Sequence, residues 1–122
     1  MKKTYPITED RIFRQLYSKG ERLIYPEIAV YYRKNKRKSD SDINYLGLTA
    51  TKKIGNAVCR NRAKRIMREA YRLCEEQIAS GYSIVLVART NTPNVSMHTV
   101  KQELIRAFKR AAISRPEPES KG

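Results

Sequence analysis

The chain has 122 residues, and its 26 Lys and Arg residues against 12 Asp and Glu residues give a formal net charge of +14 at pH 7. A pI near 10.1 indicates a polyanionic partner, either a nucleic acid or an anionic membrane surface. No apolar run approaches the roughly 18 residues of a membrane span, and the first residues lack the apolar segment of a signal peptide, so we expect a soluble, cytoplasmic protein.

This length suits one domain that buries about two thirds of its unfolded surface, which is enough for a modest core without disulfides. We assign residues 1–113 to that single domain. The tail over residues 114–122 has no apolar side chain that could join a core, and we expect it to be disordered.

A first helix is predicted to begin near Thr8, whose hydroxyl can cap it ahead of two acids, and to end at Gly20. Its apolar residues form one broad stripe: Ile12, Phe13, Leu16 and Tyr17. Such a stripe is most often core. The rings of Phe13 and Tyr17 lie one turn apart, however, and they equally suit the wall of a cleft.

Two strands are predicted next, over residues 23–33 and 43–53, and Pro26 indicates an edge strand, a bulge or a break in the first. In the first strand, alternation puts Ile28, Val30 and Tyr32 on one face and Ala29, Tyr31 and Arg33 on the other. In the second strand it assigns Leu46, Leu48 and Ala50 to the core, and Tyr45, Gly47, Thr49 and Thr51 to a small, polar face of the kind that can meet RNA.

The segment between these strands, RKNKRKSDSD over residues 33–42, has five cations in its first six positions. We interpret it as a mobile hairpin loop, a solvated or weakly RNA-contacting tip rather than a site.

The segment from Lys52 to Arg72 holds eight of the 26 Lys and Arg residues and a single acid. We predict a strand that ends near Lys53, a turn, and a helix that continues to about Ser80. Gly55 permits a positive φ in the turn, and Asn56 can cap the first helical amides. A helix start beside several cations offers both backbone N–H groups and positive charge to a phosphate.

The 100° step of a helix separates this segment into two faces. The cationic arc contains Arg60, Asn61, Lys64, Arg65, Arg68, Tyr71 and Arg72, and the apolar arc contains Ala63, Ile66, Met67, Ala70, Leu73 and Cys74. Arg62 falls near the apolar border beside Glu69, so it either meets a different RNA segment or pairs within the fold. Like charges at i, i+4 repel one another, which indicates a polyanionic partner.

Residues 82–88 are apolar on both faces and predict a central strand covered on two sides. A last helix is predicted after the cap Ser96, with Val100, Leu104, Ala107, Phe108 and Ala111 as its core stripe. The element order α-β-β(-β)-α-β-α predicts a two-layer α/β sandwich.

Cys59 and Cys74 lie 15 residues apart, which is about 22 Å along one helix, so they cannot form a disulfide. We expect Cys74 to pack as a small buried residue. One histidine, His98, and no paired cysteine spacing argue against a metal site in the protein. With no triad-like spacing and no carboxylate pair, the sequence predicts no catalytic residue.

The basic segment also carries a resemblance to a known family. Lys52-Lys53-Ile54-Gly55-Asn56-Ala57-Val58, then Arg60-Asn61-Arg62, Lys64-Arg65 and Arg68-Glu69, resembles the RNR signature of the bacterial ribonuclease P protein component. The match has no gaps, and the flanking elements are similar over residues 1–113. The resemblance implies a left-handed crossover between the strands that flank the basic helix, although parallel strands usually connect in a right-handed sense.

The resemblance implies a function as well. The protein would be the subunit of an endoribonuclease that removes 5′ leaders from precursor tRNA, with catalysis by the RNA subunit and its Mg²⁺. It would bind ribonuclease P RNA and precursor tRNA, and neither a membrane nor a small-molecule substrate. The residues carried over as contacts to the RNA or the leader are Lys52, Lys53, Asn56, Arg60, Asn61, Arg62, Lys64, Arg65 and Arg68, and Arg72 joins them on the cationic arc.

The family pattern also places Phe13, Tyr17 and Tyr31 in a cleft for the single-stranded leader. If the first helix and first strand converge, these rings form a trough floored by Gly47, Thr49 and Thr51 and rimmed by Lys64 and Arg68. The competing interpretation is that all three aromatic residues are buried core.

Two other classes of function fit the composition. A ribosomal or general RNA-binding protein without a role in catalysis would show the same charge and aromatic content. A membrane-surface protein would need a wide apolar face opposite the cations, whereas the face here contains small residues such as Ala63 and Ala70.

Overall fold

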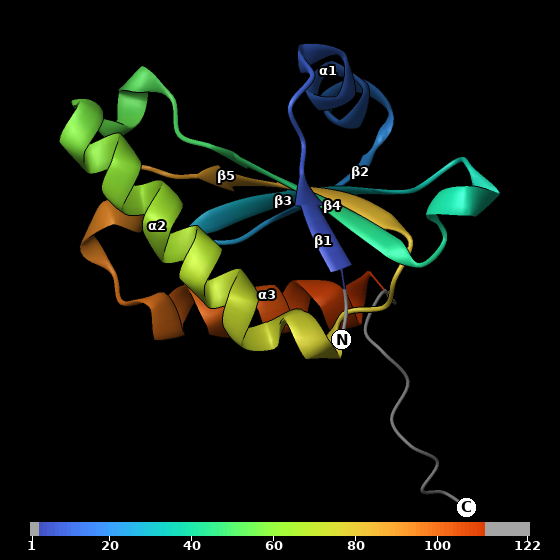
Figure 1. The fold of residues 1–122 in the computed structure, drawn as a ribbon. Helices are drawn as coiled ribbons and strands as arrows, with labels where there is room; N and C mark the ends of the chain where they lie inside the picture. The colour runs from blue at the N-terminus through green and yellow to red at the C-terminus, as the bar shows by residue number, and fades with distance from the viewer. Residues whose placement is uncertain (1–2, 112–122) are drawn as a thin grey trace, which may run out of the picture.

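The computed structural model describes residues 3–111 as a five-stranded sheet and three α-helices (Figure 1). In chain order the elements are β1 (Lys3–Pro6), α1 (Asp10–Lys19), β2 (Glu21–Ile24), β3 (Ile28–Lys34), β4 (Ile43–Thr49), α2 (Ala57–Cys74), β5 (Tyr82–Ala88) and α3 (Met97–Arg110). The tail predicted to be disordered, residues 114–122, lies outside the described residues.

The strands lie in the order β1-β4-β5-β3-β2. The central pair, β4 and β5, is parallel, and β1 also runs parallel to β4. On the other side, β3 is antiparallel to both β5 and β2. The strand predicted over residues 82–88 is confirmed to its last residue, and its central position explains why it is apolar on both faces.

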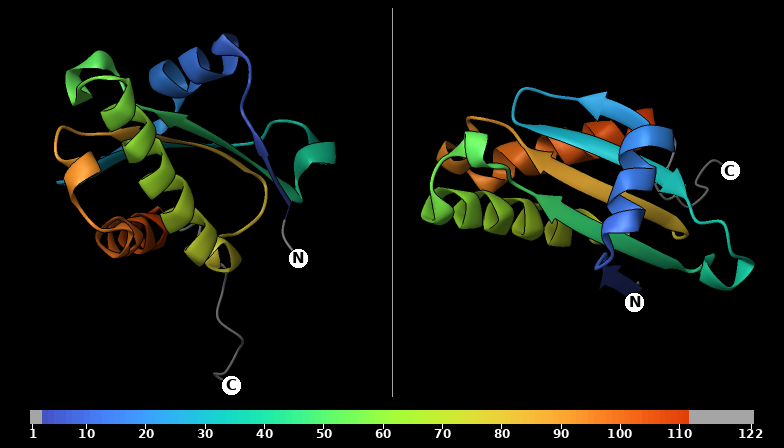
Figure 2. Two further views of the ribbon diagram at one scale, coloured as in Figure 1. Left: turned by 60° about the vertical axis from the view of Figure 1, so that its left-hand side comes forward. Right: turned by 90° about the horizontal axis from the view of Figure 1, so that it is seen from above.

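The connection from β4 through α2 to β5 is left-handed. In the view from the α1 side (Figure 2, right), β4 and β5 both run towards the left, with α2 behind the sheet. When the strands point upward and the helix faces the viewer, β5 lies to the left of β4. This is the sense implied by the family resemblance and the reverse of the usual rule.

The helices cover the two faces of the sheet unequally. α2 and α3 lie together against one face, while α1 alone crosses the other face (Figure 2, left). The larger core cluster lies between the sheet and the α2–α3 pair and includes Ile84, Leu86, Met67, Leu104 and Phe108. The smaller cluster lies under α1 and centres on Ile7, Leu16 and Val85. The α/β class is confirmed. The sheet and the α2–α3 pair form the two main layers, and α1 lies on the opposite face of the sheet.

Strand β1 is missing from the predicted element order. It has only four residues, and its hydrogen-bonding partner is β4, about forty residues along the chain, so no local pattern announces it. The predicted strand over residues 23–33 is two strands, because a turn at Pro26 folds β2 back onto β3. The amide of Tyr25 donates to the carbonyl of Ile28 across this turn at 2.8 Å.

Three predicted helix or strand ends also differ from the structure. Glu9 rather than Thr8 is the N-cap of α1, and it makes no side-chain capping bond. β4 ends at Thr49, because residues 52–54 form a 3-10 turn instead of continuing the strand. α2 ends at Cys74, and after a second 3-10 turn over residues 75–77 the chain becomes extended at Ile78, whose side chain is fully buried.

Among residues 3–111, no helix has the length and apolar content needed to cross a membrane.

Candidate nucleic-acid interface

Three aromatic side chains meet between α1 and the sheet. Tyr17 is the central one: its ring centroid lies 6.4 Å from that of Phe13 and 4.9 Å from that of Tyr31, with the Tyr31 contact edge to face. This geometry is typical of a favourable aromatic pair. The predicted convergence of the first helix and the first long strand is therefore present.

These rings are only partly covered. Tyr17 is 41% exposed, and Phe13 and Tyr31 have intermediate burial, so the three are not a buried core. Some of each ring packs on the sheet, while the Tyr17 ring also faces solvent. A base can stack on a ring of this kind without unfolding the protein.

Side chains predicted to form the walls of the trough cover part of its predicted floor. The Phe13 ring lies directly on Gly47, where a Cβ atom would come within 2.6 Å of the Phe13 Cε1 atom. The Tyr17 hydroxyl hydrogen bonds with the Thr49 hydroxyl at 3.0 Å. Thr51 is exposed and lies beyond the end of β4. Of the residues predicted to form the walls and floor of the trough, Tyr17 and Thr51 are therefore the exposed ones.

The turn before α2 is built as the sequence predicts. Gly55 has φ +138°, and the Asn56 side chain accepts a hydrogen bond from the amide of Cys59 at 3.0 Å. The Arg60 guanidinium donates to the Gly55 carbonyl at 2.8 Å and closes the turn from the helix side. Asn56 and Arg60 therefore hold the turn in shape, while Lys52 and Lys53 on it are exposed.

The buried stripe of α2 is rotated by about 50° from the predicted apolar arc, at 100° per residue. Tyr71, assigned to the cationic arc, is only 3% exposed, and Leu73, assigned to the apolar arc, is 46% exposed. The reason is β1, because the Tyr71 hydroxyl hydrogen bonds with Thr4 at 3.1 Å and draws that edge of the helix inward. Thr4 also donates to the Glu75 carboxylate.

The cations of α2 remain on one side of the helix after this rotation. Asn61, Arg65, Arg68 and Arg72 are exposed, and Arg60 and Lys64 are half-buried. Arg62 is exposed on a separate edge, and no ion pair joins it to Glu69 in the described residues. The first turns of α2 rise at the end of the sheet towards the side that carries α1, as Figure 1 and Figure 2 (left) both show.

Burial also shifts two titrating groups on α2. It raises the pKa of the Tyr71 hydroxyl to about 12 and the pKa of the Cys74 thiol to about 12. Cys74 is fully buried, as predicted, and its thiol donates to the Ala70 carbonyl at 3.3 Å. Both groups are neutral at physiological pH and belong to the packing of the helix.

Both cysteines are free. In the part of the chain that the structure describes, no three His, Cys, Asp or Glu side chains gather in a way that could hold a metal ion. His98 is exposed in the first turn of α3.

The sequence did not predict one further group of residues on the α1 side of the sheet. Arg33, Ser83 and Tyr45 are neighbours in register across β3, β5 and β4, and they line a cavity beside α1. Alternation had already placed Arg33 with Tyr31, and Tyr45 with Gly47. The feature of the sequence that could have indicated this group is Ser83, the only polar residue in the interior of β5.

Comparison with known proteins gives a consistent result. A family model described as Ribonuclease P matches residues 1–112. The ribonuclease P protein component of Listeria innocua is 35% identical over 97% of both chains, and that of Clostridioides difficile is 34% identical over 92% of this chain and 96% of the relative.

Solved structures agree with the sequence relatives. The RNase P protein of Staphylococcus aureus superposes with a TM-score of 0.75 at 28% identity, covering 91% of this chain and 98% of that one. The RNase P protein of Thermotoga maritima superposes with a TM-score of 0.73 at 29% identity, covering 86% of this chain and 96% of that one.

Proposed function

This chain belongs to the ribonuclease P protein family, and we propose that it is the protein subunit of a ribonucleoprotein that removes 5′ leaders from precursor tRNA in the cytoplasm. The RNA subunit performs the Mg²⁺-dependent cleavage. The protein binds that RNA and holds the leader. Membership of this family favours such a role over that of a ribosomal or general RNA-binding protein.

The observation that carries the proposal is the partly exposed aromatic cluster on the α1 face of the sheet, the side towards which the first turns of the basic helix rise. Tyr17 presents a ring that is 41% exposed, and Phe13 and Tyr31 support it from both sides. Aromatic faces bind unpaired bases with little regard to sequence, at about 1–3 kcal/mol per base. A leader differs in sequence from one precursor to the next, so this kind of contact suits it.

The exposed cations of α2 and of the turn before it bind RNA phosphates in this proposal. Lys52, Lys53, Arg65, Arg68 and Arg72 are all exposed. Contacts of this kind position an RNA without reading its bases, and they weaken as salt increases. The turn held by Asn56 and Arg60 fixes where these cations stand, so the two residues act through the shape of the turn.

The test is cleavage of precursor tRNA at low Mg²⁺ by the matching RNA subunit, with and without this protein. We expect cleavage in the presence of both and none from rigorously RNA-free protein, because the sequence predicts no catalytic residue. Metal-dependent cleavage by the protein alone would overturn the proposal.

A matched pair of variants tests the leader contact in the same assembly. Tyr17→Ala removes the ring and should weaken binding of leader-bearing tRNA by about 1–3 kcal/mol while leaving mature tRNA binding unchanged. Tyr17→Phe keeps the ring, loses only the bond to Thr49, and should bind both forms as the parent does. Equal losses for leader-bearing and mature tRNA in Tyr17→Ala would place the leader elsewhere.

A further inference from the structure

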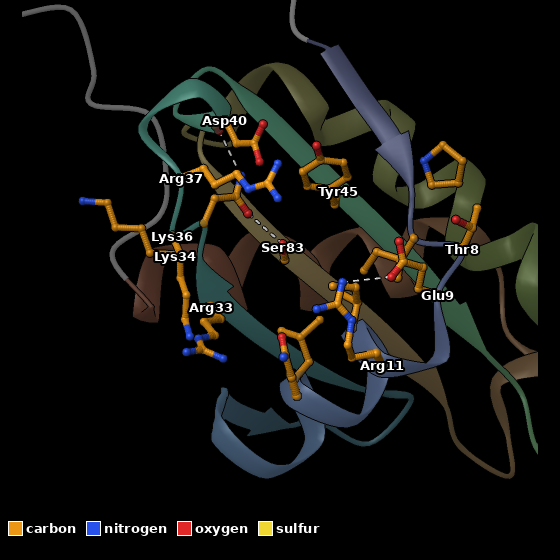
Figure 3. Close-up of a pocket in the computed structure, with 16 residues that line it drawn as sticks. Thr8, Glu9, Arg11, Arg33, Lys34, Lys36, Arg37, Asp40, Tyr45 and Ser83 are labelled. Atoms are coloured by element: carbon orange, nitrogen blue, oxygen red, sulfur yellow. Dashed lines mark hydrogen bonds and ion pairs between the residues drawn. The ribbon is translucent and has the colours of Figure 1, made fainter.

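A cavity of about 340 Å³ opens beside α1 (Figure 3), and Phe13, Tyr17 and Tyr31 are not among its lining residues. α1 crosses the strands, so it divides the sheet face into two halves (Figure 2, right). One half carries Tyr31, Gly47 and Thr49, and the other carries Arg33 and Tyr45. Ligand pockets in proteins start at roughly 300 Å³, so this cavity is large enough for a small group.

The cavity has a cationic wall and an apolar wall. The β3–β4 segment supplies Arg33, Lys34, Lys36 and Arg37, and the segment leading into α1, with α1 itself, supplies Pro6, Ile7, Ile12 and Leu16. Tyr45 closes the floor between them (Figure 3). A ligand that matches both walls has an anionic part and a flat or apolar part.

The charges in the cavity do not cancel one another. Five cations line it against two carboxylates, Glu9 and Asp40, which leaves an excess of three positive charges. Glu9 already pairs with Arg11 at 3.0 Å. Among residues 3–111, no ion pair engages the four cations that the β3–β4 segment contributes to the cavity. Uncompensated cations around one cavity repel each other, and a bound anion relieves that repulsion.

Hydrogen bonds of Asn35 hold the cationic wall in place. The Asn35 amide donates to the carbonyls of Asp40 at 3.0 Å and Ile43 at 2.8 Å, and its oxygen accepts from the Ser83 hydroxyl at 2.7 Å. The backbone amide of Asn35 donates to the Gly81 carbonyl at 2.8 Å. The segment predicted to be a mobile loop therefore has a fixed base, and a fixed site loses less entropy on binding.

We propose that this cavity binds one nucleotide unit of single-stranded RNA, with its phosphate on Arg33 and Arg37 and its base or ribose between Ile12 and Tyr45. The inference rests on the proposed function, because it adds a second RNA contact to the same protein. The two contacts lie on opposite sides of α1. A guanidinium pairs with phosphate through two parallel hydrogen bonds, and the tyrosine ring gives a base a surface to stack on.

The two walls argue for a nucleotide over other anions. A free inorganic phosphate would use the cations and leave the apolar wall in contact with water. An acidic peptide would meet the two carboxylates of the cavity as well as its cations. A nucleotide is the RNA component that is anionic at one end and flat at the other.

The first experiment uses the isolated protein and uridine 5′-monophosphate, followed by NMR. Binding should move the amide signals of Tyr45, Ser83 and Asn35, and Arg33→Ala with Arg37→Ala should weaken it about tenfold or more. The matched control is Lys109→Ala with Arg110→Ala, which removes the same charge from the end of α3 and should leave the affinity unchanged.

Three results would overturn the proposal: equal losses in the two double variants, signal changes confined to α2, or inorganic phosphate that binds as tightly as the nucleotide. None of them depends on cleavage activity, so a failure here is separate from a failure of the proposed function.

A second experiment identifies the source of the nucleotide in the assembled ribonucleoprotein. If the leader supplies it, Arg33→Ala with Arg37→Ala should weaken binding of precursors with long leaders and not of those with short ones. If the RNA subunit supplies it, the variant should weaken assembly equally for every precursor and lower the salt slope of RNA binding by about 0.7, the value for one single-strand phosphate. An unchanged affinity for both RNAs would overturn the proposal.

Discussion

The two faces of the sheet differ in how completely their side chains are buried. On the face under α2 and α3, the cluster is continuous and its central residues, including Ile84, Leu86 and Met67, are fully buried. On the face under α1, the buried cluster is small and consists of Ile7, Leu16 and Val85, and polar or half-exposed residues surround it on both sides. One helix cannot cover a five-stranded sheet.

This contrast separates the side chains that stabilise the fold from those that stay within reach of solvent. Burial of apolar area provides most of the free energy of folding, so the α2–α3 face stabilises the protein. The α1 face gives up part of that burial and keeps rings, hydroxyls and cations within reach of solvent. Strand β5 contributes to both faces, since Leu86 points to one and Val85 to the other.

The largest expected effect compares the same substitution on the two faces. Leu86→Ala, from a side chain that is 0% exposed, should cost about 3–5 kcal/mol of unfolding free energy. Leu16→Ala, from a side chain that is 1% exposed, should cost only about 2–3 kcal/mol. Leu16 borders the cavity, so water and neighbouring side chains can enter the space that it leaves.

Urea unfolding followed by circular dichroism measures both values under the same conditions. Equal costs, or a larger cost for Leu16→Ala, would mean that the α1 face contributes at least as much to stability as the other face.

The next effect appears at alkaline pH and belongs to the α2–α3 face. The pKa of Cys74 is raised from 9.0 to about 12 by burial, and that of Tyr71 from 10.0 to about 12. For an acid whose pKa is higher in the folded state, stability is full below the unfolded pKa and is lost as pH rises towards the folded one. The protein should therefore lose stability between pH 9 and 12.

Cys74→Ala should remove the thiol share of this loss, about 2–3 kcal/mol at roughly pH 11, as urea midpoints measured over a pH series would show. Cys59→Ala changes a half-buried thiol and serves as the control. If both variants lose stability as steeply as the parent, the buried thiol plays no part in alkaline unfolding.

Much of the fold follows from local patterns in the sequence. Alternation fixed the faces of β3 and β4, and the caps Asn56 and Ser96 occur where the helices begin. Such features depend on neighbours in sequence, and a single chain shows them. β1 was not predictable, because four residues become a strand only through pairing with β4. The inward turn of Tyr71 depends on β1 as well, so one missed strand also changed the exposed face of α2.

The candidate sites also have a part that local patterns predict and a part that depends on contacts distant in sequence. The cationic helix and the aromatic stripe of α1 are periodic, and both were predicted. That Phe13 would cover Gly47 was not, because the contact depends on how α1 sits on the sheet. The cavity beyond α1 has the same cause: Arg33, Ser83 and Tyr45 come from three strands and meet only once those strands are in register.

The smallest expected effect tests how α1 is seated on its face of the sheet. An added Cβ at Gly47 would lie 2.6 Å from Cε1 and 2.7 Å from Cζ of Phe13, so Gly47→Ala must displace the Phe13 ring and should cost about 1–3 kcal/mol. In a Phe13→Ala background the ring is absent. Gly47→Ala should then be neutral or slightly stabilising, since glycine inside a strand costs about 0.5–1 kcal/mol relative to alanine. The double-mutant cycle, measured by urea unfolding, should give a coupling of at least about 1 kcal/mol.

Thr49→Ala is the control, because its side-chain partner is Tyr17, and its cost should add independently to that of Phe13→Ala. If Gly47→Ala costs the same with and without Phe13, the ring does not rest on the strand, and α1 is held to the sheet by its other contacts, including those of Leu16, Ile12 and Tyr17.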